Sequence, residues 1–544
     1  MHEAIERKLK EIENDIAPGD WEINERGVQR ERTIYKKGKL VDSYTEIASP
    51  IAIVPTAILE NMDTQTEKLE LSFFKHNRWQ KLITERSVTA NRNSIIKLAD
   101  KGLEVNSENA TILVKYIADV VAGSLFCLPH KPAKSVMGWV EDEFMPYTDK
   151  IAFDGDDQFK YLYRAISHKG KLDEWTSFVA PLRESLDLRL CMAASFASPI
   201  IEIIGENPFV FHLWGGTGSG KTCAIMVAMS IWGDPSMGKL TRTMNMTANS
   251  MLSTAAFLRN LPFAGDELQT IKSRWTNYDN LIMCITEGID RGRMSYDKVN
   301  ETKAWKCSFL FTGEEPCIKQ ASGGGAKNRV IEVECKDRIV ENGNLVANFT
   351  RTHFGCAGKP YIEQIKKEDV SEQYKRIFSK ILESADTTDK QAGAMALMLV
   401  ADHIASRLFW PDEKPLAISD VQRYLCSSSE VDVVERAYQF VRNAIAENSA
   451  NFSKDARQTW GTLHGDDFAY INKNVLCRIM EDAGFDFDAV KTKWAERGYL
   501  EKNSQNKYHH SRSENGIRAM YVKIKLATEM WEDIDAGDDL PFDE

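Results

Sequence analysis

Long apolar runs are missing from this sequence of 544 residues, since no window approaches the ~18 consecutive apolar residues of a membrane-spanning helix. Residues 1–16 alternate acids and bases, without the apolar run or the small-residue cleavage site of a signal peptide. The ten cysteines form no C-x-x-C pair and have no His-x-His partner, which is typical of buried thiols in a reducing compartment. We therefore expect a cytoplasmic protein with no disulfide, no structural zinc and no membrane partner.

Basic residues are also fewer than acidic ones, so the formal net charge is -11. This charge argues weakly against nucleic-acid binding. The deficit lies mainly at one end, where residues 527–544 contain eight acids and no base. The composition is otherwise ordinary for a globular protein, with 43% hydrophobic and 27% charged residues. At ~150 residues per domain, the chain should form about three or four units.

Changes of pattern along the chain predict an α/β protein of four units and a tail. An N-terminal α+β domain is followed by short apolar strands that alternate with helices, as in a parallel sheet. A helix that is apolar nearly all round, KQAGAMALMLVADHIASRLFW, should pack inside a helical lid and connector. Two short helical patterns and two β-type runs then indicate a winged helix, which an acidic disordered tail follows. The predicted boundaries are 1–204, 205–345, 346–450, 451–526 and 527–544.

The most specific motif is a complete G-x-x-x-x-G-K-[ST] phosphate loop, which lies between the apolar run FVFHL and a helical run that starts at Lys221. Glycine lets the loop backbone close around phosphates, and the N–H groups at the helix start point at the same place. Lys221 would reach the β and γ oxygens of ATP or GTP, and the Thr222 hydroxyl would bind Mg²⁺. The alternative is a glycine-rich turn with a chance lysine. The loop residues are Gly215, Gly216, Thr217, Gly218, Ser219, Gly220, Lys221 and Thr222.

Hydrolysis needs further groups, because Mg²⁺ requires a second anchor and the attacking water requires an orienting group. The segment LPFAGDE ends in two carboxylates, of which Asp266 would hold the metal and Glu267 would polarise the water. The alternative is that these acids are plain turn or N-cap residues. The next apolar strand, 307–311, ends in TGEEP, where we assign Thr312 to sensing the γ-phosphate. Glu314 is the rival for this role, and a plain turn after the strand is the alternative.

A glycine-rich segment, SGGGAKNR, leads into the strand 330–333 and ends in Arg329. A mobile segment before an arginine suits a side chain that reaches across a subunit boundary to a neighbour's γ-phosphate, as arginine fingers do. Arg329 is therefore our candidate for a catalytic residue that acts in trans.

Two basic regions are candidates for DNA contact. Residues 287–306 could form a hairpin that faces DNA phosphates in the channel of a ring, with Lys298 as the best candidate; a solvated charged hairpin is the alternative. In the winged helix, bases cluster on the second helix and the wing, which would contact DNA unless the domain serves protein contacts. The candidates are Arg291, Arg293, Lys298 and Lys303 in the first region, and Lys491, Lys493 and Arg497 in the second.

In this order, the motifs resemble those of AAA+ replicative helicases related to the minichromosome maintenance family. They are more similar still to the self-loading helicases and replication initiators of staphylococcal cassettes and pathogenicity islands. The resemblance covers roughly residues 20 to 526 and includes MGWVEDEFMP, LPFAGDELQ, FLFTGEEP, KNRVIEVE and GIRAMYVKI. It implies an AAA+ ATPase core that uses ATP and Mg²⁺, a hexameric ring on single-stranded DNA, and self-loading at origin DNA. The chain departs from the minichromosome maintenance pattern at Glu315, where that pattern has an asparagine, and no second sensor arginine lies near Lys390.

The sequence therefore predicts an ATP-dependent DNA helicase and replication initiator of a mobile genetic element. The alternatives are an origin-binding ATPase that acts only as an assembly switch, and a motor on another polymer. The set Lys221, Asp266, Glu267 and Arg329 favours continuous turnover. The segment DDLPF near the end resembles the acidic tip with which bacterial single-stranded DNA-binding proteins recruit partners, so the tail is a candidate docking site for host replication proteins; a solubilising tail is the alternative.

Overall fold

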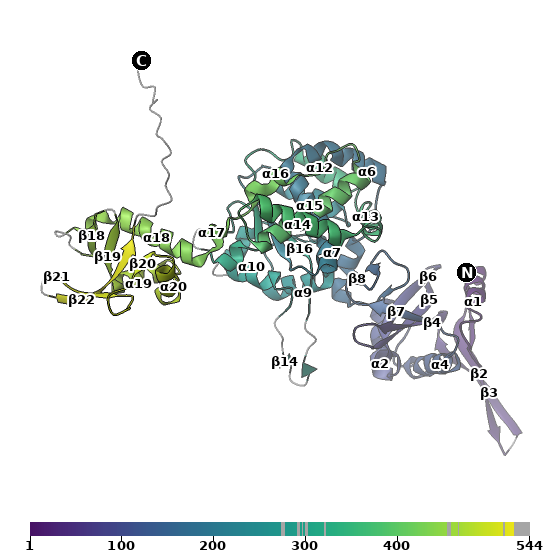
Figure 1. The fold of residues 1–544 in the computed structure, drawn as a ribbon. Helices are drawn as coiled ribbons and strands as arrows, with labels where there is room; N and C mark the ends of the chain where they lie inside the picture. The colour runs from purple at the N-terminus through teal and green to yellow at the C-terminus, as the bar shows by residue number, and fades with distance from the viewer. Residues whose placement is uncertain are drawn as a thin grey trace.

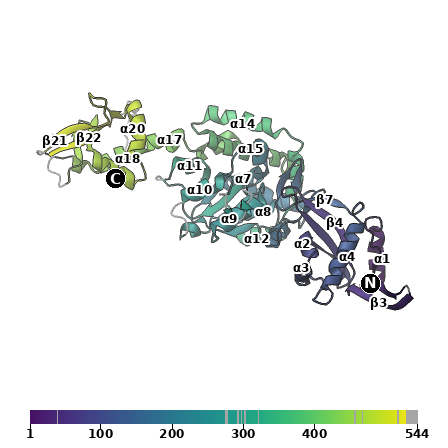
Figure 2. The same cartoon turned by 90° about the horizontal axis from the view of Figure 1, so that it is seen from below.

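The structure is a computed structural model that describes residues 1–544 except 38, 274–277, 291–293, 296–297, 300–302, 320–321, 454–457, 466, 515–516 and 527–544. Three bodies, each with its own hydrophobic core, follow one another in a row (Figure 1 and Figure 2). Helices and strands contribute to every body, so the predicted mixed α/β class is confirmed. The predicted acidic tail and its docking role lie outside the described residues.

The N-terminal body packs helices against two sheets. Its elements are α1 (His2–Glu11), β1 (Glu22–Asn24), β2 (Gly27–Lys36), β3 (Lys39–Ser49), β4 (Ile53–Asn61), β5 (Glu67–Lys75), β6 (Arg78–Glu85), α2 (Arg86–Thr89), α3 (Arg92–Ile95), η1 (Ile96–Lys101), α4 (Ala110–Gly123), β7 (His130–Lys134) and β10 (Ala152–Phe153). One sheet has the order β1-β2-β3 and the other the order β10-β7-β4-β5-β6. Leu113, Tyr116 and Val120 recur at helical spacing on α4 and are fully buried, so this face of the helix anchors the core.

The central body contains a parallel sheet and most of the helices. Its elements are β8 (Gly138–Val140), β9 (Glu143–Met145), η2 (Asp157–Phe159), α5 (Lys160–Ala165), α6 (Leu172–Val179), η3 (Ala180–Glu184), α7 (Leu186–Ile204), β11 (Phe209–Trp214), α8 (Lys221–Ser230), β12 (Thr241–Thr243), α9 (Ala248–Leu258), β13 (Phe263–Asp266), η4 (Leu268–Ser273), α10 (Tyr278–Thr286), β14 (Met294–Ser295), β15 (Lys298–Val299), β16 (Ser308–Gly313), α11 (Gly324–Lys327), β17 (Val330–Glu334), α12 (Gly343–Thr350), α13 (Gly358–Ile365), α14 (Val370–Ser384), α15 (Asp389–Phe409), α16 (Ile418–Val421) and η5 (Gln422–Tyr424).

The central sheet has the order β12-β13-β16-β11-β17, and every neighbouring pair runs parallel. Strands β11, β13 and β16 are buried along almost their whole length, which explains their continuous apolar sequences. Because the carboxyl ends of parallel strands meet at one edge, the segments that follow β11, β13 and β16 come together there.

The C-terminal body combines short helices with an antiparallel sheet. Its elements are α17 (Ser428–Val431), α18 (Val433–Glu447), η6 (Ser449–Phe452), β18 (Gly461–His464), β19 (Phe468–Asn472), α19 (Lys473–Asp482), α20 (Phe487–Glu496), β20 (Leu500–Glu501), β21 (His510–Glu514) and β22 (Ile517–Lys525). The sheet has the order β18-β19-β22-β20, and β21 also pairs with β22. Trp494 of α20 is fully buried, and its indole N–H donates to the Val434 carbonyl oxygen at 2.9 Å, which ties α20 to α18.

The domain boundaries differ from those that the sequence predicts. The central core extends from Met137 to Val421, so the predicted boundaries after residues 204 and 345 both fall inside it. The predicted boundaries place helix α7 in the N-terminal domain and α15 in the lid. In the structure these two helices pack against each other, and both contact the sheet. The C-terminal core begins at Val434 rather than near residue 451. The physical reason is that an apolar pattern shows that a helix is buried but does not show which partner buries it.

Helix α15 is the central helix of this shared core. Within the described part of the chain, it is the one helix that is long and apolar enough to cross a membrane, but 83% of its apolar window is buried inside the protein. Its one buried acid, Asp402, accepts hydrogen bonds from Arg189 at 2.8 and 2.9 Å and from Arg183 at 3.1 Å. Burial opposes the charged form of Asp402, but these two arginines outweigh it and hold the carboxyl pKa below its ordinary value of 3.8. The group therefore joins η3 and α7 to α15.

Substitution of Asp402 by Asn should lower the free energy of unfolding by about 3 kcal/mol or more, because it leaves two largely buried arginines without their shared counter-charge. The matched control is Asp412→Asn at an exposed position, which should change stability by less than about 0.5 kcal/mol. Denaturant titration of the full chain measures both. A carboxyl group whose pKa is lower in the folded than in the unfolded protein, where it is about 3.9, stabilises the fold above that pH. This stabilisation is lost as the pH falls. The difference between wild type and Asp402→Asn should therefore shrink below pH ~4, and equal stability of the two proteins at pH 7 would contradict this role.

Candidate functional site

The phosphate loop lies between β11 and α8, at the carboxyl edge of the central sheet. Gly215 and Gly220 have φ values of +150° and +94°. A Cβ atom on Gly215 would lie 2.8 Å from the Cys335 carbonyl oxygen, and one on Gly220 would lie 3.1 Å from the Val340 backbone nitrogen. Both positions therefore need glycine, because the loop is packed against the segment that follows β17.

The Lys221 ammonium is folded over the mouth of this loop. Its Nζ atom donates to the carbonyl oxygens of Gly215 and Gly216 at 2.9 and 2.8 Å, and lies 3.1 Å from the Ser219 hydroxyl. The same residue begins α8, whose first backbone N–H groups carry the positive end of the helix dipole. A positive side chain and a positive helix end thus converge on one point, which is the arrangement that binds phosphate.

The carboxylate of Asp266 connects its own strand, β13, to β16 and to the start of α8. It lies at the end of β13, is 7% exposed, and accepts the Thr222 hydroxyl with both oxygens at 3.1 Å. The Thr312 hydroxyl, at the end of β16, also donates to Asp266. Because β16 lies between β13 and β11, Thr312 is placed between the acid and the phosphate loop. Threonine hydroxyls and a carboxylate are hard oxygen ligands, so Thr222 and Asp266 are suited to hold Mg²⁺.

Glu267 adopts a strained backbone conformation next to this acid. Its φ is +61°, a left-handed value that is uncommon for a residue with a side chain and that is often found at functional sites. Its backbone N–H donates to the Thr312 hydroxyl at 3.1 Å. Thr312 therefore contacts both members of the acidic pair, whereas its rival Glu314 accepts a hydrogen bond from the Thr217 hydroxyl at 2.8 Å.

These residues line one cavity of about 350 Å³. It includes three polar residues that the sequence analysis missed, Gln269, Arg338 and Glu341. Arg338 follows β17, and its position just after the last strand of the parallel sheet is the sequence feature that could have identified it as a site residue. The lining residues are Thr217, Gly218, Gly220, Lys221, Thr222, Cys223, Asp266, Glu267, Gln269, Thr312, Gly313, Glu314, Arg338, Val340, Glu341 and Gly343.

Arg329 does not line this cavity. It precedes β17, so it lies at the amino-terminal ends of the parallel strands, whereas Lys221 lies at their carboxyl ends. Its guanidinium donates to the Gly325 carbonyl oxygen at 2.8 Å and contacts the Met283 sulfur at 3.0 Å. Since β11 and β17 are parallel neighbours, the start of β17 and the loop after β11 lie at opposite strand ends. Within one chain, Arg329 therefore cannot take part in the site around Lys221.

The predicted DNA-contact residues have different surroundings. Arg291 and Arg293 lie outside the described residues, and Lys298 starts β15, which pairs antiparallel with β14. The Lys303 ammonium donates to the Ser253 hydroxyl of α9 at 3.1 Å. Within the first predicted region, the structure thus describes two short antiparallel strands, 294–295 and 298–299, of which Figure 1 labels β14.

The basic side chains on and just after α20, the second helix of the predicted winged helix, differ in whether a carboxylate already pairs with them. Arg497 forms an ion pair with Asp432 at 2.6 Å, so it joins α20 to the start of α18. The hydrogen bond and charge of Asp432 also raise the pKa of Arg497. Lys491 donates to Asp488 at 2.5 Å within the same helix, whereas Lys493 is exposed. These charges can be counted from the sequence, but the sequence does not show which of them a carboxylate already neutralises.

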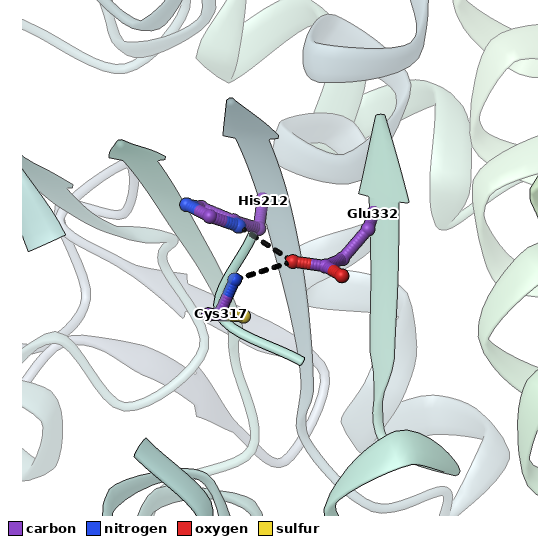
Figure 3. A group of neighbouring side chains, drawn as sticks. All are labelled: His212, Cys317 and Glu332. Atoms are coloured by element: carbon purple, nitrogen blue, oxygen red, sulfur yellow. Dashed lines mark hydrogen bonds and ion pairs between the residues drawn. The ribbon is translucent and has the colours of Figure 1, made fainter. Parts of the chain in front are cut away.

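His212, Cys317 and the partly buried Glu332 lie close together on β11, β17 and the segment after β16 (Figure 3). His212 of β11 contacts the Glu332 carboxylate of β17 through Nδ1 at 2.9 Å, and the Cys317 backbone N–H donates to the same oxygen at 2.8 Å. Their ligand atoms lie within 4.8 Å of one another, close enough for a metal ion. Burial and the Glu332 charge, however, raise the pKa of the Cys317 thiol well above 9.0, which opposes the thiolate that metals bind. We therefore assign the group to joining β11, β17 and the segment after β16.

Comparisons with known proteins fit this arrangement. Residues 21–305, more than half of the chain, match the family described as a domain of unknown function, DUF927. The chain belongs to the DUF927 family. Residues 432–529 match the Cch helix turn helix domain, which agrees with a C-terminal core that begins at Val434. A search of curated proteins finds no match to this DUF927 chain.

Among solved structures, the DUF927 chain is similar to one described as SCCmec type IV Cch, an active helicase. The TM-score is 0.72 at 17% identity, and the match covers 93% of this chain and 98% of that one. At this identity, the likeness shows a shared fold. The C-terminal region of NrS-1 also matches, with a TM-score of 0.29 at 10% identity over 86% of this chain and 96% of that one. The predicted resemblance to cassette helicases is thus confirmed for the fold and the C-terminal domain, and the relation to the minichromosome maintenance family stays a prediction.

Two substitutions in the candidate site should have different effects. Lys221→Ala removes the charge that meets the phosphates, so it should abolish both tight nucleotide binding and hydrolysis. Glu267→Gln keeps the shape of the cavity and should retain nucleotide binding, but it should slow turnover by about 100-fold or more. Fluorescent-nucleotide titration and phosphate release measure the two steps.

The matched control is Glu334→Gln, at the exposed end of β17 outside the cavity, which should keep wild-type turnover. Wild-type turnover in purified Glu267→Gln would show that Glu267 takes no part in hydrolysis. Loss of nucleotide binding in that variant would show that the carboxylate supports the loop rather than the water.

Proposed function

We propose that this chain is an ATP-dependent DNA helicase and replication initiator of a mobile genetic element, which acts as a ring on single-stranded DNA. The observation that carries the proposal is the meeting of Lys221, Thr222 and Asp266 at the carboxyl edge of the parallel sheet. The fold shared with a protein described as an active helicase, and the match to the Cch helix turn helix domain, support the same conclusion.

ATP and Mg²⁺ are the ligands that the site fits. The Thr222 hydroxyl already lies 3.1 Å from both Asp266 oxygens, so two hard ligands for Mg²⁺ converge without rearrangement. Thr222 and Asp266 would hold Mg²⁺, and the bound ion would offset the negative charge that develops on the phosphates during hydrolysis. Lys221 is positioned to exchange its contacts with the loop carbonyl oxygens for contacts with phosphate oxygens. The strand order supports a P-loop core of the AAA+ type.

Glu267 and Thr312 supply the steps that follow nucleotide binding. Glu267 orients and polarises the attacking water, since it lines the same cavity as Lys221 and Thr222. Thr312 is the better candidate than Glu314 for sensing the γ-phosphate. Its hydroxyl donates to the metal-binding carboxylate and accepts from the Glu267 N–H, so a displacement of Thr312 reaches both acids.

A neighbouring subunit completes the site. Arg329 lies at the edge of the sheet opposite its own phosphate loop, and the short helix α11, which contains Gly324 and Gly325, precedes it. In a hexameric ring, each Arg329 would reach the γ-phosphate held by the next subunit and stabilise the charge of the transition state. This arrangement makes hydrolysis depend on assembly.

Arg329→Ala protein should be inactive alone, yet it should regain part of its ATPase activity when mixed with inactive Lys221→Ala protein. In such mixed rings, an intact Arg329 from one variant faces an intact phosphate loop of the other. Phosphate release over a series of mixing ratios measures the rescue, and subunit exchange is checked by energy transfer between labelled chains. Absence of rescue in rings that do exchange subunits would contradict the shared site.

The C-terminal body is proposed as a winged helix that binds origin DNA. Helices α19 and α20 and the hairpin β21–β22 supply the two helices and the wing, and Lys491 and Lys493 lie on the second helix. Because Arg497 is already paired with Asp432, it contributes less to a DNA surface than the sequence predicts. Duplex origin DNA and single-stranded DNA would thus be held by different bodies.

The helicase should hydrolyse ATP faster in the presence of single-stranded DNA and should separate a forked duplex with 3′ and 5′ tails. An origin-binding ATPase that acts only as an assembly switch should bind the duplex and hydrolyse ATP without strand separation. A gel-based unwinding assay with wild-type and Glu267→Gln proteins distinguishes the two functions. DNA-stimulated hydrolysis without any unwinding would favour the switch.

A further inference from the structure

Strands β2 and β3 continue beyond the N-terminal body as a two-stranded projection, which we call the ribbon and define as residues 31–36 and 39–47 (Figure 1). Strand β1 pairs only with Gly27–Gln29 at the base of β2. Within the described part of the chain, no other strand pairs with the ribbon. Residues 33–36 and 39–45 are all exposed, whereas both strands are buried where they enter the body.

The ribbon exposes an unusual amount of apolar side chain. An isolated two-stranded hairpin is marginally stable in water because little apolar surface is covered. Six large apolar or aromatic side chains are nevertheless between 41% and 63% exposed on these two strands. They are Ile34, Tyr35, Leu40, Val41, Tyr44 and Ile47. By the strand register, Ile34 and Tyr44 lie on one face of the ribbon and Tyr35, Leu40 and Ile47 on the other. Apolar side chains are thus exposed on both faces, which is typical of an element that a partner surrounds.

The charge at the tip of the ribbon indicates the chemistry of that partner. Lys36, Lys37 and Lys39 are exposed, and among the described residues their side chains form no hydrogen bond or ion pair. At the base of the ribbon, in contrast, Arg30 and Arg32 both bind the Glu46 carboxylate. Three unpaired ammonium groups thus project from a chain of net charge -11, and they favour a partner that carries regular negative charge.

The shape of the ribbon fits the groove of a DNA duplex. The major groove is about 12 Å wide and about 8.5 Å deep, and it admits a two-stranded β ribbon. At about 3.4 Å per residue, residues 31–36 extend for about 20 Å, which is enough to reach the groove floor. A protein interface is less suited, because lysine is depleted at the centre of such interfaces.

We propose that the ribbon binds double-stranded DNA by entering the major groove. The tip lysines contact phosphates on the two sides of the groove, and Tyr35 and Leu40 pack against base edges, including thymine methyl groups. The contact is largely independent of sequence because lysine–phosphate pairs dominate it. This inference adds a duplex-holding surface to the N-terminal body, and it does not depend on ATP hydrolysis.

The test measures the affinity of the full chain for a fluorescein-labelled 20-bp duplex of mixed sequence, without nucleotide, over a series of salt concentrations. The triple variant K36A/K37A/K39A should bind the duplex at least about 10-fold more weakly, and the slope of log affinity against log salt should fall by about 2.7 for three lost phosphate contacts. The double variant Y35S/L40S should bind more weakly with an unchanged slope. The charge-conserving variant K36R/K37R/K39R should bind as the wild type does.

The matched control is K10A/K97A/K115A, which removes three exposed lysines without side-chain ion pairs from α1, η1 and α4 of the same body. It should keep wild-type affinity, and all variants should keep the wild-type melting temperature because the substituted side chains are exposed. The proposal is overturned by wild-type duplex binding in the triple lysine variant, by an equal loss in the control, or by equal affinity for a 20-nucleotide single strand. A decrease in oligomer mass of the lysine variant would instead identify a second copy of the chain as the partner. Because no nucleotide is present, these outcomes are independent of whether the chain is a helicase.

Discussion

The carboxylate of Asp266 is the constraint on which the candidate site depends. It accepts hydroxyl groups from Thr222 on one side and Thr312 on the other, so β13, β16 and the start of α8 are linked through one acid. This geometry follows from the insertion of β16 between β13 and β11, because all three strands end at the same edge. The residue proposed to hold the metal and the residue proposed to sense the γ-phosphate are therefore in direct contact. A change at either one alters the charge environment of the other without a conformational change elsewhere.

The parts of the site that depend on contiguous residues could be predicted from the sequence. A phosphate loop with a strand before it and a helix after it is a local pattern, and so are an acidic pair and a threonine at strand ends. Arg338 was missed because its approach to the loop is a tertiary contact: the segment 338–343 reaches the cavity only because Gly220 lets it pack close. Arg497 was assigned to DNA because charge counts cannot show that Asp432 already neutralises it.

The domain boundaries could not be predicted for a related reason. Helices α7 and α15 are apolar nearly all round, and such a helix needs several partners to cover it. Along the chain, α7 precedes the strands of the central sheet and α15 follows them, whereas the structure packs the two helices together and joins them through Asp402. The helical layer is thus continuous with the sheet core rather than a separate lid. Periodicity reports how much of a helix is buried, and the choice of partner is decided by contacts between distant segments.

The connection between the central and N-terminal bodies bears on how the ribbon and the nucleotide site are coupled. Strand β10, which follows the first strands of the central core, returns to pair with β7 and so adds an edge to the N-terminal sheet. Just after it, the fully buried carboxylate of Asp154 accepts hydrogen bonds from Asn61 at 3.0 Å and Ser135 at 2.8 Å. Asp154 also forms an ion pair with Lys68 of β5 at 3.4 Å, so this group anchors the returning strand to the N-terminal sheet. Since β8 and β9 belong to the central core, the chain passes from the N-terminal body to the central body and back before it enters the central body again. Because more than one segment of the chain joins these two bodies, a rotation of the central body would displace the ribbon, and the duplex that it is proposed to hold, more directly than a single linker would allow.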